Sequence, residues 1–200
     1  MTVTLAAIAL IGTISCLACL VRLHLLPTGY SPVRNAVSEY GVGRYAAWYR
    51  AQVVSLGAAA LALAAAVHQG VHGHETRAVV ALVVLGAVRI AIAAFPTDPL
   101  AAARRTRTGL IHALLAVAAF AAASVAARAF ASSIRHTAHW SSLHPDLLAL
   151  AVAVAVCAVA SALSLRVRAL RPWFGIVERC FYVSTLAWFM LVAAHLVFAA

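Results

Sequence analysis

The sequence predicts an all-α protein, a polytopic bundle of six transmembrane helices. Of its 200 residues, 65% are hydrophobic and 10% are charged, whereas soluble domains average about 25% charged residues. The apolar residues form six long runs separated by polar loops, and about 20 apolar residues in a helix cross the hydrocarbon core of a bilayer. A water-soluble fold could not bury so many long runs. We therefore expect a single integral membrane domain over residues 1–200.

The six predicted spans cover, in chain order, residues of about 3–26, 45–68, 78–95, 108–130, 146–165 and 175–200. The first run follows no basic segment and is long enough to span, so we expect a membrane helix and not a cleavable signal. The second run begins with Tyr45, Trp48 and Tyr49, which form an aromatic belt typical of a headgroup interface. The third run ends at the segment FPTDP, because proline cannot continue a helix without losing a hydrogen bond.

The net charge of +10 comes entirely from arginine, without lysine. These arginines lie at the ends of the apolar runs and form no continuous patch, which argues against a nucleic-acid partner. Most of them fall in the loops after the first, third and fifth runs: Arg34, Arg44, Arg104, Arg105, Arg107, Arg166, Arg168 and Arg171. The positive-inside rule places these loops in the cytoplasm and both termini outside. We therefore expect a multi-pass protein of the cell membrane, in a bacterial inner membrane by its arginine-rich composition.

Acidic residues indicate where chemistry is possible. The chain has five, and three of them, Glu39, Asp98 and Glu178, belong to the predicted cytoplasmic side. Arg89 lies roughly 9 Å inside its span at 1.5 Å per residue. Because a charged side chain in the bilayer costs roughly 2.5–3.5 kcal/mol on insertion scales, we expect Arg89 to face the bundle and to pair with Asp98 or Glu39. The cluster is either an ion-pair network that fixes the helices or a pocket for a polar group.

Three side chains are the candidate catalytic residues. We expect Glu39, Asp98 and His112 to converge on one pocket that opens at the cytoplasmic interface. The polar loop of residues 27–44 would fold back over the bundle, since irregular backbone at membrane depth is tolerated where protein or a water-filled cavity satisfies its polar groups. The candidate ligand contacts around this pocket are Asn35, Ser38, Tyr40, Arg89, Glu178 and Arg179.

Metal binding and nucleophilic catalysis have less support. His24, Glu39, Asp98 and His112 could together hold a metal, but they lack a diagnostic spacing, and we expect neither a metal nor another cofactor. Ser38 is next to Glu39, but adjacent residues do not make a triad, and the sequence contains no G-x-S-x-G elbow.

Four segments resemble the DUF998 family of small bacterial multi-span membrane proteins, which is named for having no assigned function. They are SPVRNAVSEYGVGRY, FPTDP, the run RTRTGLIH from Arg105 to His112, and the pair Glu178–Arg179. The resemblance extends over nearly the whole chain and implies a six-helix membrane fold. It also implies that Asn35, Ser38, Glu39, Asp98 and His112 are the family-type polar positions. It implies no reaction.

Three functions are consistent with these features. The first is a binding protein that holds the head group of a membrane lipid or isoprenoid in the polar pocket. The second is a membrane-embedded enzyme in which Glu39 or Asp98 acts as general acid in the cyclisation or hydrolysis of such a substrate, since a carboxylic acid in a low-dielectric pocket can retain and donate a proton. The third is a structural or accessory subunit. No sequence feature selects an oligomeric state.

Overall fold

The computed structural model describes residues 1–71, 75–100, 102 and 104–199, and all regular secondary structure in this part of the chain is helical. The all-α prediction is confirmed. Six α-helices follow one another: α1 (Thr2–Leu25), α2 (Ala46–Gly70), α3 (Thr76–Ile92), α4 (Arg107–Ser133), α5 (His144–Arg166) and α6 (Phe174–Phe198). Short 3-10 helices lie between them: η1 (Val37–Gly41), η2 (Ala138–Trp140) and η3 (Arg171–Trp173). Ala200, the last residue of the sixth predicted span, lies outside the described residues.

Five of the six α-helices, all except α3, are long and apolar enough to cross a membrane. The chain is therefore a multi-pass membrane protein. Helix α3 has 17 residues, which extend about 26 Å at 1.5 Å per residue. It ends three residues earlier than its predicted span, because residues 93–95 form turns before Pro96. Its own crossing of the membrane stays a prediction.

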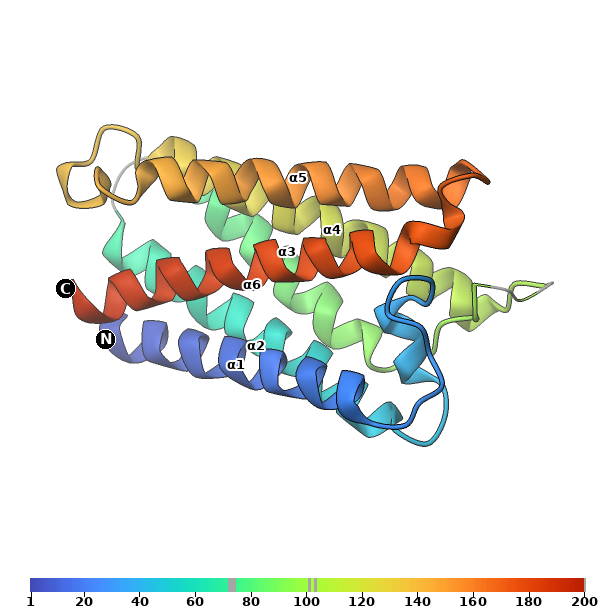
Figure 1. Ribbon diagram of the computed structural model, residues 1–200. Helices are drawn as coiled ribbons and strands as arrows, with labels where there is room; N and C mark the ends of the chain where they lie inside the picture. Colours follow the sequence, from blue (N-terminus) through green and yellow to red (C-terminus); the bar gives the residue numbers. More distant parts are fainter. Residues whose placement is uncertain (72–74, 101, 103, 200) are drawn as a thin grey trace.

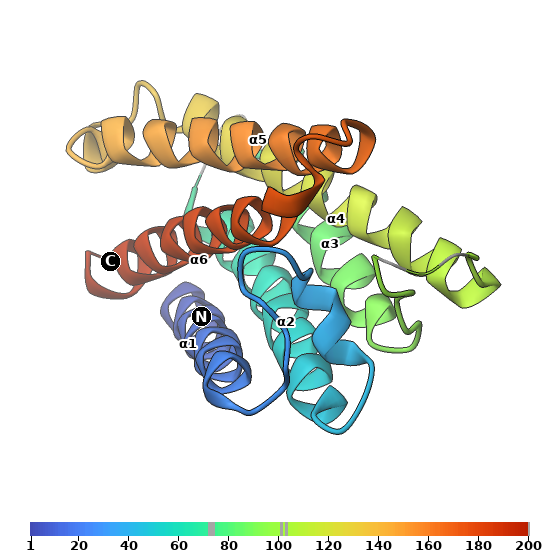
Figure 2. The same cartoon turned by 45° about the vertical axis from the view of Figure 1, so that its right-hand side comes forward.

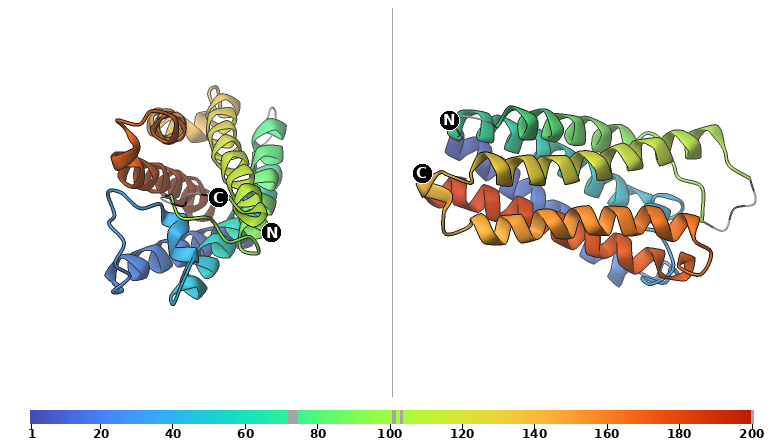
Figure 3. Two further views of the ribbon diagram at one scale, coloured as in Figure 1. Left: turned by 90° about the vertical axis from the view of Figure 1, so that its right-hand side faces the viewer. Right: turned by 90° about the horizontal axis from the view of Figure 1, so that it is seen from above.

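The helices form a ring in chain order. Each packs against its neighbours in sequence, and α6 closes the ring against α1. The views along and across the bundle show this arrangement (Figures 2 and 3). The loops after α1, α3 and α5 lie together at one end, here called the loop end, while both termini lie at the opposite, terminal end (Figure 1). The predicted grouping of the three arginine-rich loops is therefore confirmed, and their cytoplasmic location remains a prediction.

Glycine permits close contact between α2 and α3. A Cβ atom added at Gly57 of α2 would lie 2.9 Å from the carbonyl oxygen of Gly86, and one at Gly86 of α3 would lie 2.9 Å from the carbonyl oxygen of Gly57. The two backbones therefore touch, as is usual where small residues line a membrane helix interface. Helices α1, α2 and α3 thus form a tightly packed side of the ring, and the space left in the protein lies on the side of α4, α5 and α6.

Candidate functional site

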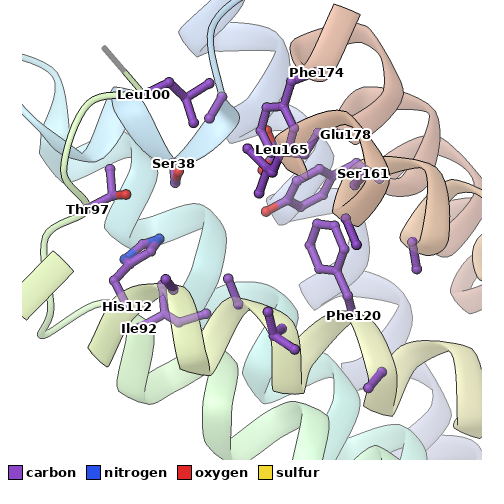
Figure 4. A pocket seen from close by; sticks show the side chains of 18 of the residues that line it. Ser38, Ile92, Thr97, Leu100, His112, Phe120, Ser161, Leu165, Phe174 and Glu178 are labelled. Carbon is purple, nitrogen blue, oxygen red and sulfur yellow. The ribbon is translucent and has the colours of Figure 1, made fainter. Parts of the chain in front are cut away.

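A cavity of about 630 Å³ opens between η1, α4, α5 and α6 at the loop end (Figure 4). Its volume falls within the usual range of small-molecule sites, about 300–1,000 Å³. The polar side chains that line its loop end are Ser38, Tyr49, Arg89, Thr97, Asp98, Arg105, His112, Glu178 and Tyr182. From there the cavity continues between α4 and α5, where alanine, valine, leucine and phenylalanine form most of its wall. The cavity is therefore amphipathic along its length.

His112 lies in the first turns of α4 and lines the cavity. Its side chain is buried, and its Nδ1 lies 2.7 Å from the carbonyl oxygen of Phe95. Since a carbonyl oxygen only accepts, Nδ1 must carry the hydrogen, and in the neutral ring Nε2 is then an acceptor. No hydrogen-bond partner for Nε2 occurs in the described part of the chain. His112 can therefore accept a hydrogen bond from a ligand in the cavity.

Asp98 also lines the cavity, and it holds the start of α4. Its two carboxylate oxygens accept hydrogen bonds from the backbone N–H and the hydroxyl of Thr106, both at 2.8 Å. The Thr106 hydroxyl oxygen in turn accepts from the N–H of Gly109 at 3.0 Å and so caps the helix. The N–H and hydroxyl of Thr106 lower the pKa of Asp98 from its ordinary value. Asp98 is therefore better suited to the ionised form than to the predicted role of general acid.

Glu39 is buried but does not line the cavity. One carboxylate oxygen accepts from the Asn35 side-chain amide at 2.9 Å and from the N–H of Ala36 at 2.8 Å. The other oxygen accepts from the N–H of Leu100 at 2.9 Å. The predicted fold-back of this loop onto the bundle is therefore correct. The carboxylate, however, fastens η1 to the loop after α3 and stands behind the cavity wall, so the geometry gives no support to Glu39 as the acid.

Glu178 is the buried carboxyl group that does face the cavity. It lies in the second turn of α6, and one of its oxygens accepts from the N–H of Val37 at 2.6 Å. The described residues provide no hydrogen-bond donor for its second oxygen. Figure 4 shows Glu178 across the cavity from His112. Ser38 of η1 lies on the cavity wall. Glu178, which the sequence indicated only as a ligand contact, therefore lies closer to the cavity than the predicted Glu39.

The prediction that Arg89 pairs with Asp98 or Glu39 is wrong. Arg89 is buried and faces the bundle as predicted, but it donates to the hydroxyl of Tyr182 at 2.9 Å and to the side-chain oxygen of Gln52 at 3.1 Å. No carboxylate in the described residues lies within ion-pair distance of it. The reason is that Glu39 and Asp98 are already bound by backbone N–H groups, while Gln52 of α2 and Tyr182 of α6 reach Arg89 with their side chains.

The remaining predicted ligand contacts hold the loop in place. Arg179 donates from Nε to Nε2 of His24 at 2.6 Å, from one terminal nitrogen to the carbonyl oxygen of Asn35 at 2.9 Å, and from the other to the hydroxyl of Tyr40 at 3.3 Å. Neither Arg179 nor Tyr40 lines the cavity. These contacts join α1, α6 and the loop of residues 26–45. In the described residues, no group of three His, Cys, Asp or Glu is placed to hold a metal.

Two residues of the site were not predicted. Gln52 supports Arg89, and its amide nitrogen donates to the sulfur of Cys16 at 3.2 Å. A lone glutamine within an apolar run was a signal for it, since a buried polar side chain needs a partner. Tyr49 was interpreted as part of an interfacial belt, but it is buried and lines the cavity, because η1 folds back over the start of α2.

The comparisons with known proteins bear on the family of the chain and not on its site. No curated protein and no solved structure matches the chain. A family model described as "Protein of unknown function (DUF998)" matches residues 10–195, which include every residue of the cavity. Because this match covers nearly the whole chain, the protein belongs to the DUF998 family.

Proposed function

We propose that the protein binds a membrane lipid or isoprenoid, with the polar head in the cavity at the loop end and the hydrocarbon chain between α4 and α5. The observation that carries this proposal is the continuity of one cavity from buried polar groups to an apolar groove. A soluble metabolite would leave the apolar part empty, and a plain hydrocarbon would leave the buried polar groups without partners, which costs free energy.

The polar end of the cavity offers both hydrogen-bond donors and hydrogen-bond acceptors. His112 Nε2 and the second oxygen of Glu178 can accept hydrogen bonds, while the Ser38 hydroxyl can donate or accept. Arg89 supplies a positive charge that no carboxylate in the described residues contacts directly. A head group that carries both a hydroxyl and a phosphate satisfies this set, because the hydroxyl can donate to His112 or Glu178 and the phosphate matches the charge of Arg89.

The groove suits a chain that enters from the bilayer. Small residues on the facing sides of α4 and α5, including Ala116 and Ala158, leave the space between the helices. Val117 and Val159 line the groove and are 67% and 59% exposed, so its outer side opens toward lipid. The two serines in its wall donate their hydroxyls to carbonyl oxygens of their own helices. The groove therefore presents little polarity to a hydrocarbon chain.

A second candidate function is an enzyme that acts on the head of the same ligand. The observation that favours it is the pair formed by His112 Nε2 and the Glu178 carboxyl group, which face one cavity without other partners for those atoms in the described residues. An acceptor and a carboxyl group on opposite sides of a substrate suit proton transfer to and from it. This candidate moves the acid from Glu39 or Asp98 to Glu178.

The test is quantitative mass spectrometry of the lipids that remain with the protein after purification in mild detergent. We expect a defined lipid in a fixed ratio to the chain. Ala116→Phe fills the groove and should remove that lipid, whereas Leu114→Phe is the matched control. Leu114 is on the same helix, is 63% exposed and does not line the cavity.

Retention of the same lipid by Ala116→Phe would contradict the proposal, and the absence of any defined lipid from the wild type would favour the accessory-subunit function. His112→Gln and Glu178→Gln separate the first two functions. If they keep the lipid but accumulate a chemically different form of it, the protein is an enzyme. If the bound lipid is the same in all variants that retain it, binding is the function.

A further inference from the structure

A second hollow lies at the terminal end of the same two helices. Its volume is about 910 Å³, and it is lined by the first turn of α3, the last turns of α4 and a residue of α5. Three of its lining residues, Ser124, Val125 and Ala155, also line the cavity of the loop end. The two spaces therefore meet in the middle of α4 and α5 and form one groove along most of the bundle.

The charge of this hollow is positive. Its charged side chains are Arg77 and Arg128, and no acidic residue lines it. In the described residues, neither arginine has a carboxylate within ion-pair distance. Arg128 donates to the hydroxyl of Ser132 at 3.0 Å, which holds the guanidinium over the rim. The hydroxyls of Ser124, Ser132 and Ser133 donate to carbonyl oxygens of α4, so the two guanidinium groups are the main donors that line the hollow. Two guanidinium groups around one hollow are suited to a phosphate group.

The distance along α4 indicates that the two arginines lie near the membrane surface opposite to the loop end. Arg128 follows His112 by 16 residues on one continuous helix, which corresponds to about 24 Å at 1.5 Å per residue. The hydrocarbon core of a bilayer is about 30 Å thick. The two polar ends of the groove are therefore separated by nearly the thickness of a bilayer, and each lies near a different membrane surface.

We propose that the phosphate of an anionic phospholipid binds to Arg77 and Arg128 at the terminal end, with an acyl chain in the part of the groove that both spaces share. The phosphate site is separate from the polar groups of the loop end, although the two spaces share the apolar part of the groove. The proposal does not rest on the function proposed for the loop-end cavity. A bound phospholipid explains why uncompensated positive charge is placed at the mouth of an apolar groove, and why the groove continues beyond the first cavity.

The test uses nanodiscs of phosphatidylcholine that contain increasing amounts of phosphatidylglycerol. The protein is extracted into mild detergent, and the retained phosphatidylglycerol is quantified by mass spectrometry relative to phosphatidylcholine. The wild type should be enriched in phosphatidylglycerol. The double variant Arg77→Gln/Arg128→Gln should bind phosphatidylglycerol on the order of 30-fold more weakly and so lose the enrichment. This factor corresponds to about 1 kcal/mol for each arginine near a membrane surface. Arg77→Lys/Arg128→Lys should retain part of it, which shows that loss of charge and not misfolding is responsible.

Controls separate this site from general attraction and from substitutions outside the hollow. Arg135 lies at the same end of the bundle, is exposed and does not line the hollow, so Arg135→Gln should keep the enrichment. An equal loss in Arg135→Gln, or unchanged enrichment in the double glutamine variant, would overturn the proposal. Leu114→Phe, at an exposed residue of α4 that lines neither space, should also keep the enrichment, and its loss there would overturn the proposal. Soluble glycerol phosphate should not displace the lipid, and displacement would indicate a site for free phosphate.

Discussion

Arg89 of α3 donates a 2.9 Å hydrogen bond to the hydroxyl of Tyr182 of α6, and its guanidinium carbon also lies 5.3 Å from the centroid of that ring. A charge in the middle of the bundle is thus held by a phenol and by the amide oxygen of Gln52. Within the described residues, the Nε atom of Arg89 is buried without a hydrogen-bond partner. This arrangement connects α2, α3 and α6 at the wall of the cavity, which Arg89 itself lines.

The first prediction concerns this contact. Tyr182→Phe removes an acceptor from a buried charged donor and should lower the free energy of unfolding by about 1.5–3 kcal/mol, the usual value of a hydrogen bond to a charged group. Arg89→Leu should abolish most of the effect of a subsequent Tyr182→Phe, because the donor is then absent. Thermal unfolding of the purified variants in detergent gives the coupling through a double-mutant cycle. Additive effects of the two substitutions would show that the contact carries no stability.

The second prediction concerns Glu39. Its carboxylate accepts three hydrogen bonds, two of them from backbone N–H groups. In Glu39→Gln, the amide nitrogen that replaces one carboxylate oxygen must face a backbone donor, so at least one buried bond is lost, at a cost of about 1–3 kcal/mol. We expect lower thermal stability with unchanged lipid content. Glu75→Gln is the control, since its 3.9 Å contact to His68 lies at the terminal end. Full stability together with loss of the lipid would instead place Glu39 in the binding site.

The third prediction follows from the depressed pKa of Asp98, which the N–H and hydroxyl of Thr106 cause. A carboxyl group whose pKa is lower in the folded state stabilises the fold above its unfolded pKa, about 3.9, and loses this contribution as the pH falls through the folded value. The wild type should therefore lose stability more steeply than Asp98→Asn as the pH is lowered below about 4. Unfolding temperatures over this range give the comparison. Parallel curves would show that the Thr106 contacts do not favour the ionised carboxylate.

The helices and their grouping could be predicted from the sequence because both depend on local features. Long apolar runs determine the spans, Pro96 ends the third run, and chain order places alternate loops at the same end. The inward position of Arg89 followed from the cost of a charge in lipid. These predictions needed no knowledge of which helix contacts which. The six helices, the grouping of their loops and the buried position of Arg89 are confirmed, while the crossing by the third run stays a prediction.

The partners inside the bundle depend on tertiary packing, and the sequence did not reveal them. Glu39 binds the N–H groups of Ala36 and Leu100, and every residue except proline has such a group, so residue type gives no signal. Likewise, η1 forms in a loop with two prolines and three glycines, and its packing buries Tyr49 and brings Val37 to Glu178. The sequence indicated that three carboxyl groups lie at the loop end, but which of the three faces the cavity depended on this fold.

The last prediction concerns topology, including the crossing by α3. In a variant whose native cysteines are replaced, single cysteines at Thr76, Arg104 and Ser142 report the two ends of α3 and the loop before α5, and all three side chains are exposed. The positive-inside rule predicts that an impermeant thiol reagent labels the cysteines at Thr76 and Ser142 on intact cells. The cysteine at Arg104 should react only after the cells are made permeable. Labelling of Thr76 and Arg104 from the same side would show that α3 does not cross the membrane. Labelling of Arg104 alone on intact cells would reverse the orientation and place the polar cavity at the outer surface.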